Sequence, residues 1–277
     1  MTMSRLPIAA LAAFAASYAW GDGIADLNVY GNEIRATVEL ANGVEADVTV
    51  AFEQASGLDV SSIGLSADLI DPLDPALLSR LPGTLVSVPA AFPLLLTIEP
   101  PNEGTLSFLG VATVSLHTHN LGYSVGSPFR LFVADDGGSF EDITDRASSG
   151  SYRVRGSQGE FCEFMIVADL RQIGAVIDSK FDRVENILNS NQSLVNNSLH
   201  SQLANTLAGA RTAYDAGDEV SAIRELDAFS AMVRQNAGGA IPNLWRARDD
   251  IINLDGQLRA AASSLRYSLS LLANDLP

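Results

Sequence analysis

This chain has few basic residues and a single cysteine, and each shortage excludes a class of structure or partner. With one cysteine in 277 residues, no intramolecular disulfide can form, so stability must come from packed cores. Lys and Arg number 17 against 33 Asp and Glu, which gives a formal net charge of -16. Such a surface repels phosphate backbones and anionic lipid headgroups, so we expect no nucleic-acid partner.

Sequence motifs of common enzymes are also missing. The chain has no G-x-S-x-G, P-loop, G-x-G-x-x-G, H-E-x-x-H or C-x-x-C pattern. Nothing in it therefore indicates a serine hydrolase, a nucleotide enzyme or a dinucleotide enzyme. We predict no catalytic, cofactor-binding or metal-ligating residues and no cofactor. The expected function is a non-enzymatic binding or structural module with an unknown protein or glycan partner.

The first residues have the pattern of a secretory signal peptide. Arg5 precedes an alanine-rich apolar run over residues 6–16, and Ser17-Tyr18-Ala19 is a small-x-small cleavage pattern. The run is shorter than the roughly 20 apolar residues that span a bilayer. We therefore predict a signal peptide at residues 1–19, cleaved near Ala19. The mature chain is expected to be secreted or periplasmic, with no transmembrane segment.

Residues 24–169 have the pattern of a β domain. From Val44 to Phe52, apolar residues fall at nearly every second place, and Asn42-Gly43 is a strong hairpin signal. This predicts a hairpin over residues 31–53. Residues 59–83 carry three prolines and predict a loop with one short helix at 75–79. Further short apolar runs, bounded by turn residues, predict an N-terminal antiparallel β-sandwich.

After Leu170 the apolar period changes to three and four, which indicates helices. The first runs over residues 173–188, with Lys180 as the one polar residue on its apolar face. The second has Ser198 as its expected N-cap.

The third helix is expected to start after Asp218, with Val220 on its apolar face, and the last to run from Pro242 to Leu272. Short connections favour antiparallel packing, so residues 170–277 are predicted to form a C-terminal helical bundle. The fold class is thus α+β. No flexible linker separates the two domains, which predicts a fixed relation between them.

Two stretches resemble known families. Residues 92–171 resemble uncharacterised secreted proteins of Gram-negative bacteria, in which a β module precedes a helical tail. The same run is similar to ZU5-like sandwiches through "TIEPP", "FEDIT" and "GEFCEFMIVA", and residues 203–233 are similar to the FIMAH helical module of bacterial surface enzymes. The resemblance implies a secreted accessory or interaction module with no known reaction.

Cys162 has three possible roles. Strand alternation puts it on one face with Phe164 and Ile166, which favours a small buried hydrophobe. Some ZU5-like domains cut themselves at a His-Phe-Ser site, and the matching residues here are Glu160, Phe161 and Cys162. That resemblance implies a self-cleaving alternative with Cys162 as nucleophile, although the histidine is missing. A disulfide between chains would need an exposed thiol.

Two further groups suggest metals. His117 and His119 are two apart, on one strand face, which leaves open a metal-dependent hydrolase, although metal sites usually need three or four ligands. The loop with Asp135, Asp136, Glu141 and Asp142 is rich in oxygen ligands but does not match the EF-hand spacing. Whether it binds calcium is left open.

Overall fold

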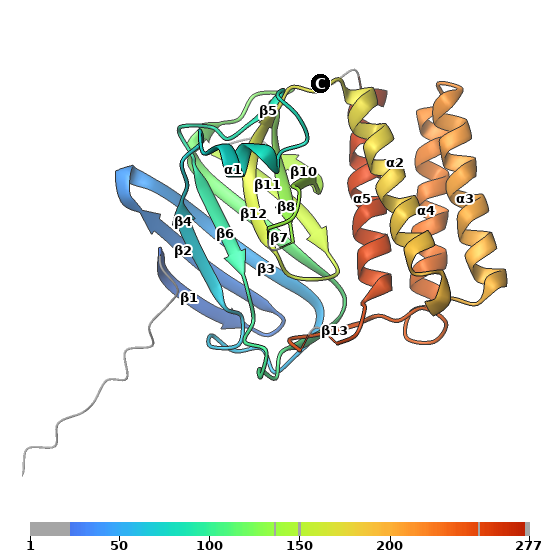
Figure 1. The fold of residues 1–277 in the computed structure, drawn as a ribbon, viewed down its shortest axis with the longest axis horizontal. Helices are drawn as coiled ribbons and strands as arrows, with labels where there is room; N and C mark the ends of the chain where they lie inside the picture. Colours follow the sequence, from blue (N-terminus) through green and yellow to red (C-terminus); the bar gives the residue numbers. More distant parts are fainter. Residues whose placement is uncertain (1–22, 136, 149–150, 249, 275–277) are drawn as a thin grey trace, which may run out of the picture.

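A computed structural model describes residues 23–135, 137–148, 151–248 and 250–274 of the chain (Figure 1). The predicted signal peptide, residues 1–19, lies outside these ranges. Two antiparallel sheets form a sandwich, and a helical bundle lies beside it. The predicted α+β class is confirmed.

The first sheet has the strand order β1-β2-β3-β7-β11-β10, with β13 also paired to β7. The predicted hairpin is confirmed, because β2 pairs with β3 from Glu33 opposite Ala51 to Leu40 opposite Val44. Asn42 has a φ of 64°, a conformation that asparagine tolerates better than most residues. The strands are β1 (Ile24–Tyr30), β2 (Glu33–Leu40), β3 (Val44–Ser56), β7 (Ser107–Gly122), β10 (Thr144–Ser148), β11 (Ser151–Gln158) and β13 (Leu244–Arg246).

The second sheet has the order β4-β6-β12-β8-β9, with β5 also paired to β12. Three of its short strands were not predicted, namely β5, β9 and β4, the last of which lies inside the expected loop at residues 59–83. Strand β4 is short, and prolines follow it closely, which hid its alternation of buried Leu65 and Ala67. The strands are β4 (Leu65–Leu69), β5 (Val86–Ser87), β6 (Leu94–Ile98), β8 (Phe129–Ala134), β9 (Glu141–Asp142) and β12 (Glu163–Asp169).

Alternate residues of the strands fill the space between the two sheets. Val50 and Leu116 of the first sheet pack in one buried cluster with Phe164 and Ile166 of the second. Burial of this apolar surface is the main stabilising term of the sandwich.

The second sheet is buried on its outer face as well. Met165 and Val167 of β12 pack with Leu77 of α1 (Pro75–Ser79), the short helix that the prolines predicted. The Asp74 carboxylate caps α1 by accepting a hydrogen bond from the Ala76 amide. Burial on both faces explains the continuous apolar run in β12.

Four helices form the bundle, namely α2 (Ile173–Ser190), α3 (Asn197–Asp215), α4 (Glu219–Gln235) and α5 (Leu254–Ala273). Asp218 caps α4 as predicted, but the N-cap of α3 is Asn196 and not Ser198. Val220 is 64% exposed and does not belong to the buried face of α4. Within the described ranges, no helix has the length and apolar character needed to cross a membrane.

The prediction that the last helix starts at Pro242 is wrong, because α5 starts at Leu254. The preceding segment forms β13, which pairs with β7 and places Trp245 against the rings of Phe108 and Phe161. Burial of this tryptophan in the sandwich core overrides the helical pattern.

Helix α5 joins the bundle to the sandwich because two of its faces are buried. Leu258 and Leu265 pack into the bundle core, whereas a second stripe of small and polar residues meets the first sheet. At its start, the Asn253 side chain accepts a hydrogen bond from the Gly256 amide and donates to the carbonyls of Gly110 and Gly159. One buried residue thus caps the helix and fixes it to the sandwich.

Candidate functional site

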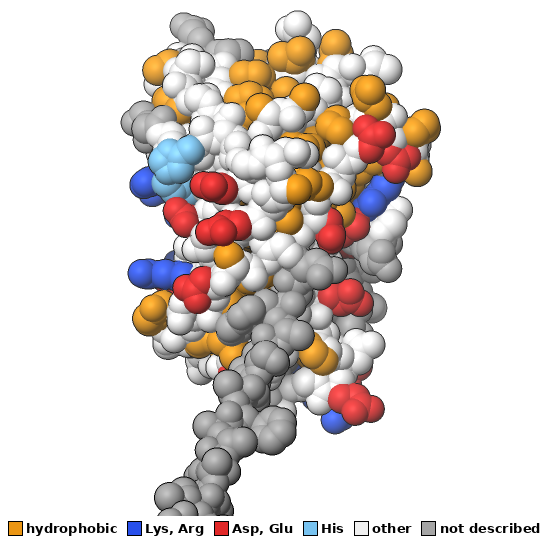
Figure 2. All heavy atoms as spheres, turned by 90° about the vertical axis from the view of Figure 1, so that its left-hand side faces the viewer, with side chains coloured by type: hydrophobic (Ala, Val, Ile, Leu, Met, Phe, Trp, Pro, Cys, Tyr) orange, Lys and Arg blue, Asp and Glu red, His pale blue; other side chains and the backbone are white. Residues whose placement is uncertain are grey.

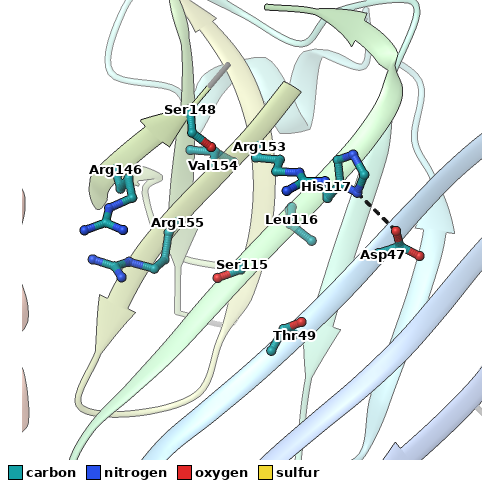
Figure 3. A pocket seen from close by; sticks show the side chains of 10 residues that line it. All are labelled: Asp47, Thr49, Ser115, Leu116, His117, Arg146, Ser148, Arg153, Val154 and Arg155. Carbon is teal, nitrogen blue, oxygen red and sulfur yellow. Dashed lines mark hydrogen bonds and ion pairs between the residues drawn. The ribbon is translucent and has the colours of Figure 1, made fainter. Parts of the chain in front are cut away.

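The outer face of the first sheet, which points away from the second sheet, carries a shallow hollow. It crosses β3, β7, β11 and β10 and has a volume of about 420 Å³ (Figure 3). Three arginines, one histidine and one aspartate define its chemistry, and we call it the arginine groove: Arg146, Arg153, Arg155, His117 and Asp47. Figure 2 shows histidine side chains at the margin of the sandwich, with basic and acidic side chains beside them.

Strand register brings these side chains together. Arg146 of β10 is the direct partner of Arg155 of β11, Arg153 is the partner of His117 on β7, and His117 is the partner of Asp47 on β3. Between the two arginines of β11, Val154 points into the core. Alternation therefore puts the charged side chains of the groove on the same face of the sheet, opposite the core.

Only one of the three arginines has an acidic partner among the described residues. The Arg155 Nε donates to Asp145 Oδ1 at 2.6 Å, and the Asp145 side chain, 3% exposed, also accepts from Ser157. Arg146 and Arg153 are exposed, and no described carboxylate lies within ion-pair distance of either. Like charges directly opposite each other destabilise a sheet, so folding alone does not account for Arg146 beside Arg155.

His117 is held by its neighbours. Its Nδ1 lies 3.1 Å from Asp47 Oδ2, and its Nε2 is hydrogen-bonded to the Ser151 hydroxyl. The ring of His119 is 4.8 Å away, centroid to centroid. Over the described ranges, no group of three or more His, Cys, Asp or Glu side chains could hold a metal ion. The two histidines are therefore adjacent, as expected from their spacing, but without a third described ligand.

Cys162 lies in the core between the sheets, 7% exposed, and the predicted buried hydrophobe is confirmed. Its Sγ is 3.4 Å from Asp135 Oδ1. Burial raises the pKa of the thiol far above its usual value, and the negative charges of Glu160 and Asp135 raise it further. A thiol in this setting is protonated at neutral pH and is a weak nucleophile.

The acidic residues near residue 135 have separate partners. Asp135 contacts Cys162, Glu141 pairs with Arg183, and Asp142 is buried against Lys180, while Asp136 lies outside the described residues. The three that are described do not gather around a common point.

A buried ion pair between the sandwich and the bundle was not predicted. Lys180 Nζ of α2 lies 2.6 Å from Asp142 Oδ2, and it also donates to the Ser268 hydroxyl and the Ser264 carbonyl. Burial alone would raise the pKa of Asp142, but the ammonium of Lys180 and hydrogen bonds from Thr144 outweigh it, and the pKa falls below its usual value. Burial also lowers the pKa of Lys180, against the opposing effect of Asp142. A lysine on the apolar face of a helix was the signal in the sequence, but its partner lies 38 residues away, in the second sheet.

The arginine groove was not predicted either. The alternation of Arg153 and Arg155 is visible in "YRVRG", but nothing in the sequence shows that β10 and β7 flank β11 in this register.

Comparisons with other proteins identify a family but no activity. No curated protein and no solved structure matches the chain. Residues 8–273 match a family described as a family of unknown function, DUF6689. Since the match covers nearly the whole chain, the protein belongs to the DUF6689 family.

Proposed function

We propose that this protein is an exported, non-enzymatic binding module whose arginine groove binds an anionic group of its partner. The observation that carries the proposal is the pair Arg146 and Arg153, exposed and without a described acidic partner in a chain of net charge -16. The acidic residues of the surface already account for solubility, so the clustered arginines need another explanation. Binding of an anion would be one.

Arginine suits this role better than lysine would. Its planar guanidinium donates two parallel hydrogen bonds to a carboxylate, sulfate or phosphate, and such charge-assisted bonds are roughly twice as strong as neutral ones. Arg155 is already oriented by Asp145, and Figure 3 shows its guanidinium beside that of Arg146. An anion between the two would relieve their repulsion.

Binding of small anions tests the proposal. The probes are glucuronate, a sulfated monosaccharide and inorganic phosphate, titrated while amide chemical shifts are recorded. We expect shifts centred on β10 and β11. Replacing Arg146 and Arg153 together by serine should weaken binding about tenfold or more, because two charge-assisted contacts are lost.

A double variant with the same change in charge serves as the control. Arg224 and Arg248 are exposed and lie outside the groove. Replacing both by serine should leave anion binding nearly unchanged. If both double variants weaken binding equally, the effect comes from net charge and the groove is not the site.

Export is part of the same proposal. It is supported by the signal-peptide pattern of residues 1–19 and by the resemblance to secreted Gram-negative proteins with ZU5-like and FIMAH-like modules. The intact mass of the exported protein under denaturing, non-reducing conditions tests it, with one species of residues 20–277 as the expected result. Two fragments meeting between Phe161 and Cys162 would instead favour the self-cleaving alternative.

The metal-dependent hydrolase alternative has its own test. Stoichiometric zinc in the purified protein, lost on replacement of His117 or His119, would favour it over the binding module.

A further inference from the structure

A second hollow continues the arginine groove across the same sheet face. It has a volume of about 480 Å³ and lies over β1, β2 and β3. Asp47 and Thr49 line both hollows, so the two share a wall at β3. A ligand in the arginine groove can therefore extend across the strands into this second hollow only by passing over Asp47 and Thr49.

The charge changes sign along this face. The second hollow, which we call the acidic hollow, is lined by Asp26, Glu33 and Asp47 with one arginine, Arg35, which is paired with Glu33. A ligand with a negative charge on every unit would be attracted at β11 and repelled at β1. Nucleic acids and polyphosphates fit the face poorly for this reason.

The remaining groups of the acidic hollow suit hydroxyls and an apolar ring face. Carboxylates accept hydrogen bonds from hydroxyl donors, and the Asn28 amide and the Thr37 and Thr49 hydroxyls both donate and accept. Tyr30 remains 58% exposed although the guanidinium of Arg35 lies 5.3 Å from its ring centroid. Its free surface offers an aromatic platform with few rotatable bonds.

An extended peptide fits this face less well. Peptides that bind along sheets do so by hydrogen bonding to the backbone of an edge strand. Here the four central strands under the two hollows, β2, β3, β7 and β11, are paired on both sides, so over them only side chains are presented. The edge strands β1 and β10 lie at the two ends of the face, and a peptide added to either edge would run alongside the face and not across it.

We infer that the ligand is an acidic oligosaccharide, with a sugar carboxylate in the arginine groove and neutral sugars over the acidic hollow. The inference rests on the proposed function, because it adds a second subsite to the same anion site. A uronic acid supplies the charge at one end, and neutral sugars supply hydroxyls and an apolar ring face at the other.

The experiment uses an array of oligosaccharides that each carry one uronic acid at one end. Each is compared with the neutral oligosaccharide of the same length, with free glucuronate and with a hexaglutamate peptide. We expect at least one acidic oligosaccharide to bind about tenfold more tightly than both glucuronate and its neutral counterpart.

Variants of Tyr30 separate the two hollows. Tyr30→Ala should abolish the higher affinity of the oligosaccharide over glucuronate and leave the affinity for glucuronate itself unchanged. Tyr30→Phe keeps the ring and should retain most of that higher affinity. Double replacement of Arg146 and Arg153 should weaken every acidic probe.

The outcomes that overturn the inference differ from those that overturn the proposed function. If glucuronate binds in the arginine groove but a longer oligosaccharide binds no more tightly, the anion site is supported and the acidic hollow is not part of the binding site. An equal gain for hexaglutamate, with the same dependence on Tyr30, would assign the face to acidic peptides instead. If no anion binds in a way that depends on Arg146 and Arg153, both the inference and the proposed function are overturned.

Discussion

Charged side chains gather in two regions of this molecule, which differ in whether the cations have carboxylate partners. Between the sandwich and the bundle, Arg259 is bound by Glu53 and Asp255, and Lys180 is bound by Asp142. On the outer face of the first sheet, Arg146 faces another arginine. The first region pairs each of these cations with a carboxylate, and the second leaves two cations without one.

The physical reason for the difference is the local dielectric. A buried charge without a partner is strongly unfavourable, so the interface can exist only if its charges are paired. Water screens exposed charges, so the repulsion between the arginines of the groove destabilises the folded protein by only about a few tenths of a kcal/mol. Folding therefore explains the interface charges but not the two unpaired arginines of the groove. Removing Lys180 or Asp142 should destabilise the protein, whereas removing Arg146 should not.

The largest expected effect is at the buried ion pair. Lys180→Met leaves the carboxylate of Asp142 buried without its counter-charge, and Asp142→Asn leaves Lys180 in the same condition. Each should lower the free energy of unfolding by about 3–5 kcal/mol, measured by urea denaturation. The double variant should lose less than the sum of the two, because no uncompensated charge remains. Losses below about 1 kcal/mol for both single variants would show that water reaches the pair in solution.

Chemical labelling gives an independent measurement of the same interface. Lys180 is the single lysine of the chain and is 5% exposed. An amine-reactive reagent should label it at least roughly a hundredfold more slowly in the native protein than in urea, since labelling requires the interface to open. Asp142→Asn should accelerate native labelling, and an unchanged native rate would contradict the role of the pair in closing the interface.

A steric test at the start of α5 should have the next largest effect. A Cβ on Gly256 would lie 2.4 Å from the Gly110 carbonyl oxygen and 2.8 Å from the Gly159 Cα. Gly256→Ala should therefore destabilise the protein by about 2–3 kcal/mol, although alanine is the better helix former. Gly209→Ala in α3 is the control, because the nearest atom to its Cβ would be Glu225 Oε2, at an ordinary contact distance of 3.7 Å. That variant should gain up to about 1 kcal/mol. A Gly256→Ala protein as stable as the wild type would show that α5 is not in close contact with the sheet.

The sequence could predict features that depend on local signals, but not contacts between distant residues. Period and turn residues were sufficient for the β2–β3 hairpin, α1 and the fold class, because those signals are local. They failed for β13, where the burial of Trp245 against Phe108 decides the conformation. The pairing of Lys180 with Asp142 and the register of Arg146 opposite Arg155 join distant parts of the chain, so no local pattern could show them.

Acid should weaken the interface in a defined direction. The pKa of Asp142 in the folded protein lies below its ordinary value of 3.8, so the unfolded chain binds this proton first as the pH falls. The contribution of Asp142 is complete above about pH 4 and is lost as the pH falls through the folded pKa. Unfolding measured from pH 6 to pH 3 should show a steeper loss of stability for the wild type than for Asp142→Asn. Parallel curves would mean that the carboxyl titrates alike in both states.

The smallest expected effects lie in the arginine groove, where two neighbouring arginines should respond differently. Arg146→Ser removes a repulsion and breaks no described ion pair, so the free energy of unfolding should stay constant or rise by up to about 0.5 kcal/mol. Arg155→Ser should lower it by about 1 kcal/mol, because the nearly buried Asp145 loses its partner. Urea midpoints at low and high salt measure both, and the gain for Arg146→Ser should shrink as salt screens the repulsion. If Arg146→Ser destabilises the protein as much as Arg155→Ser, then Arg146 also stabilises the fold. The groove would then resemble the interface, where the charged side chains contribute to stability.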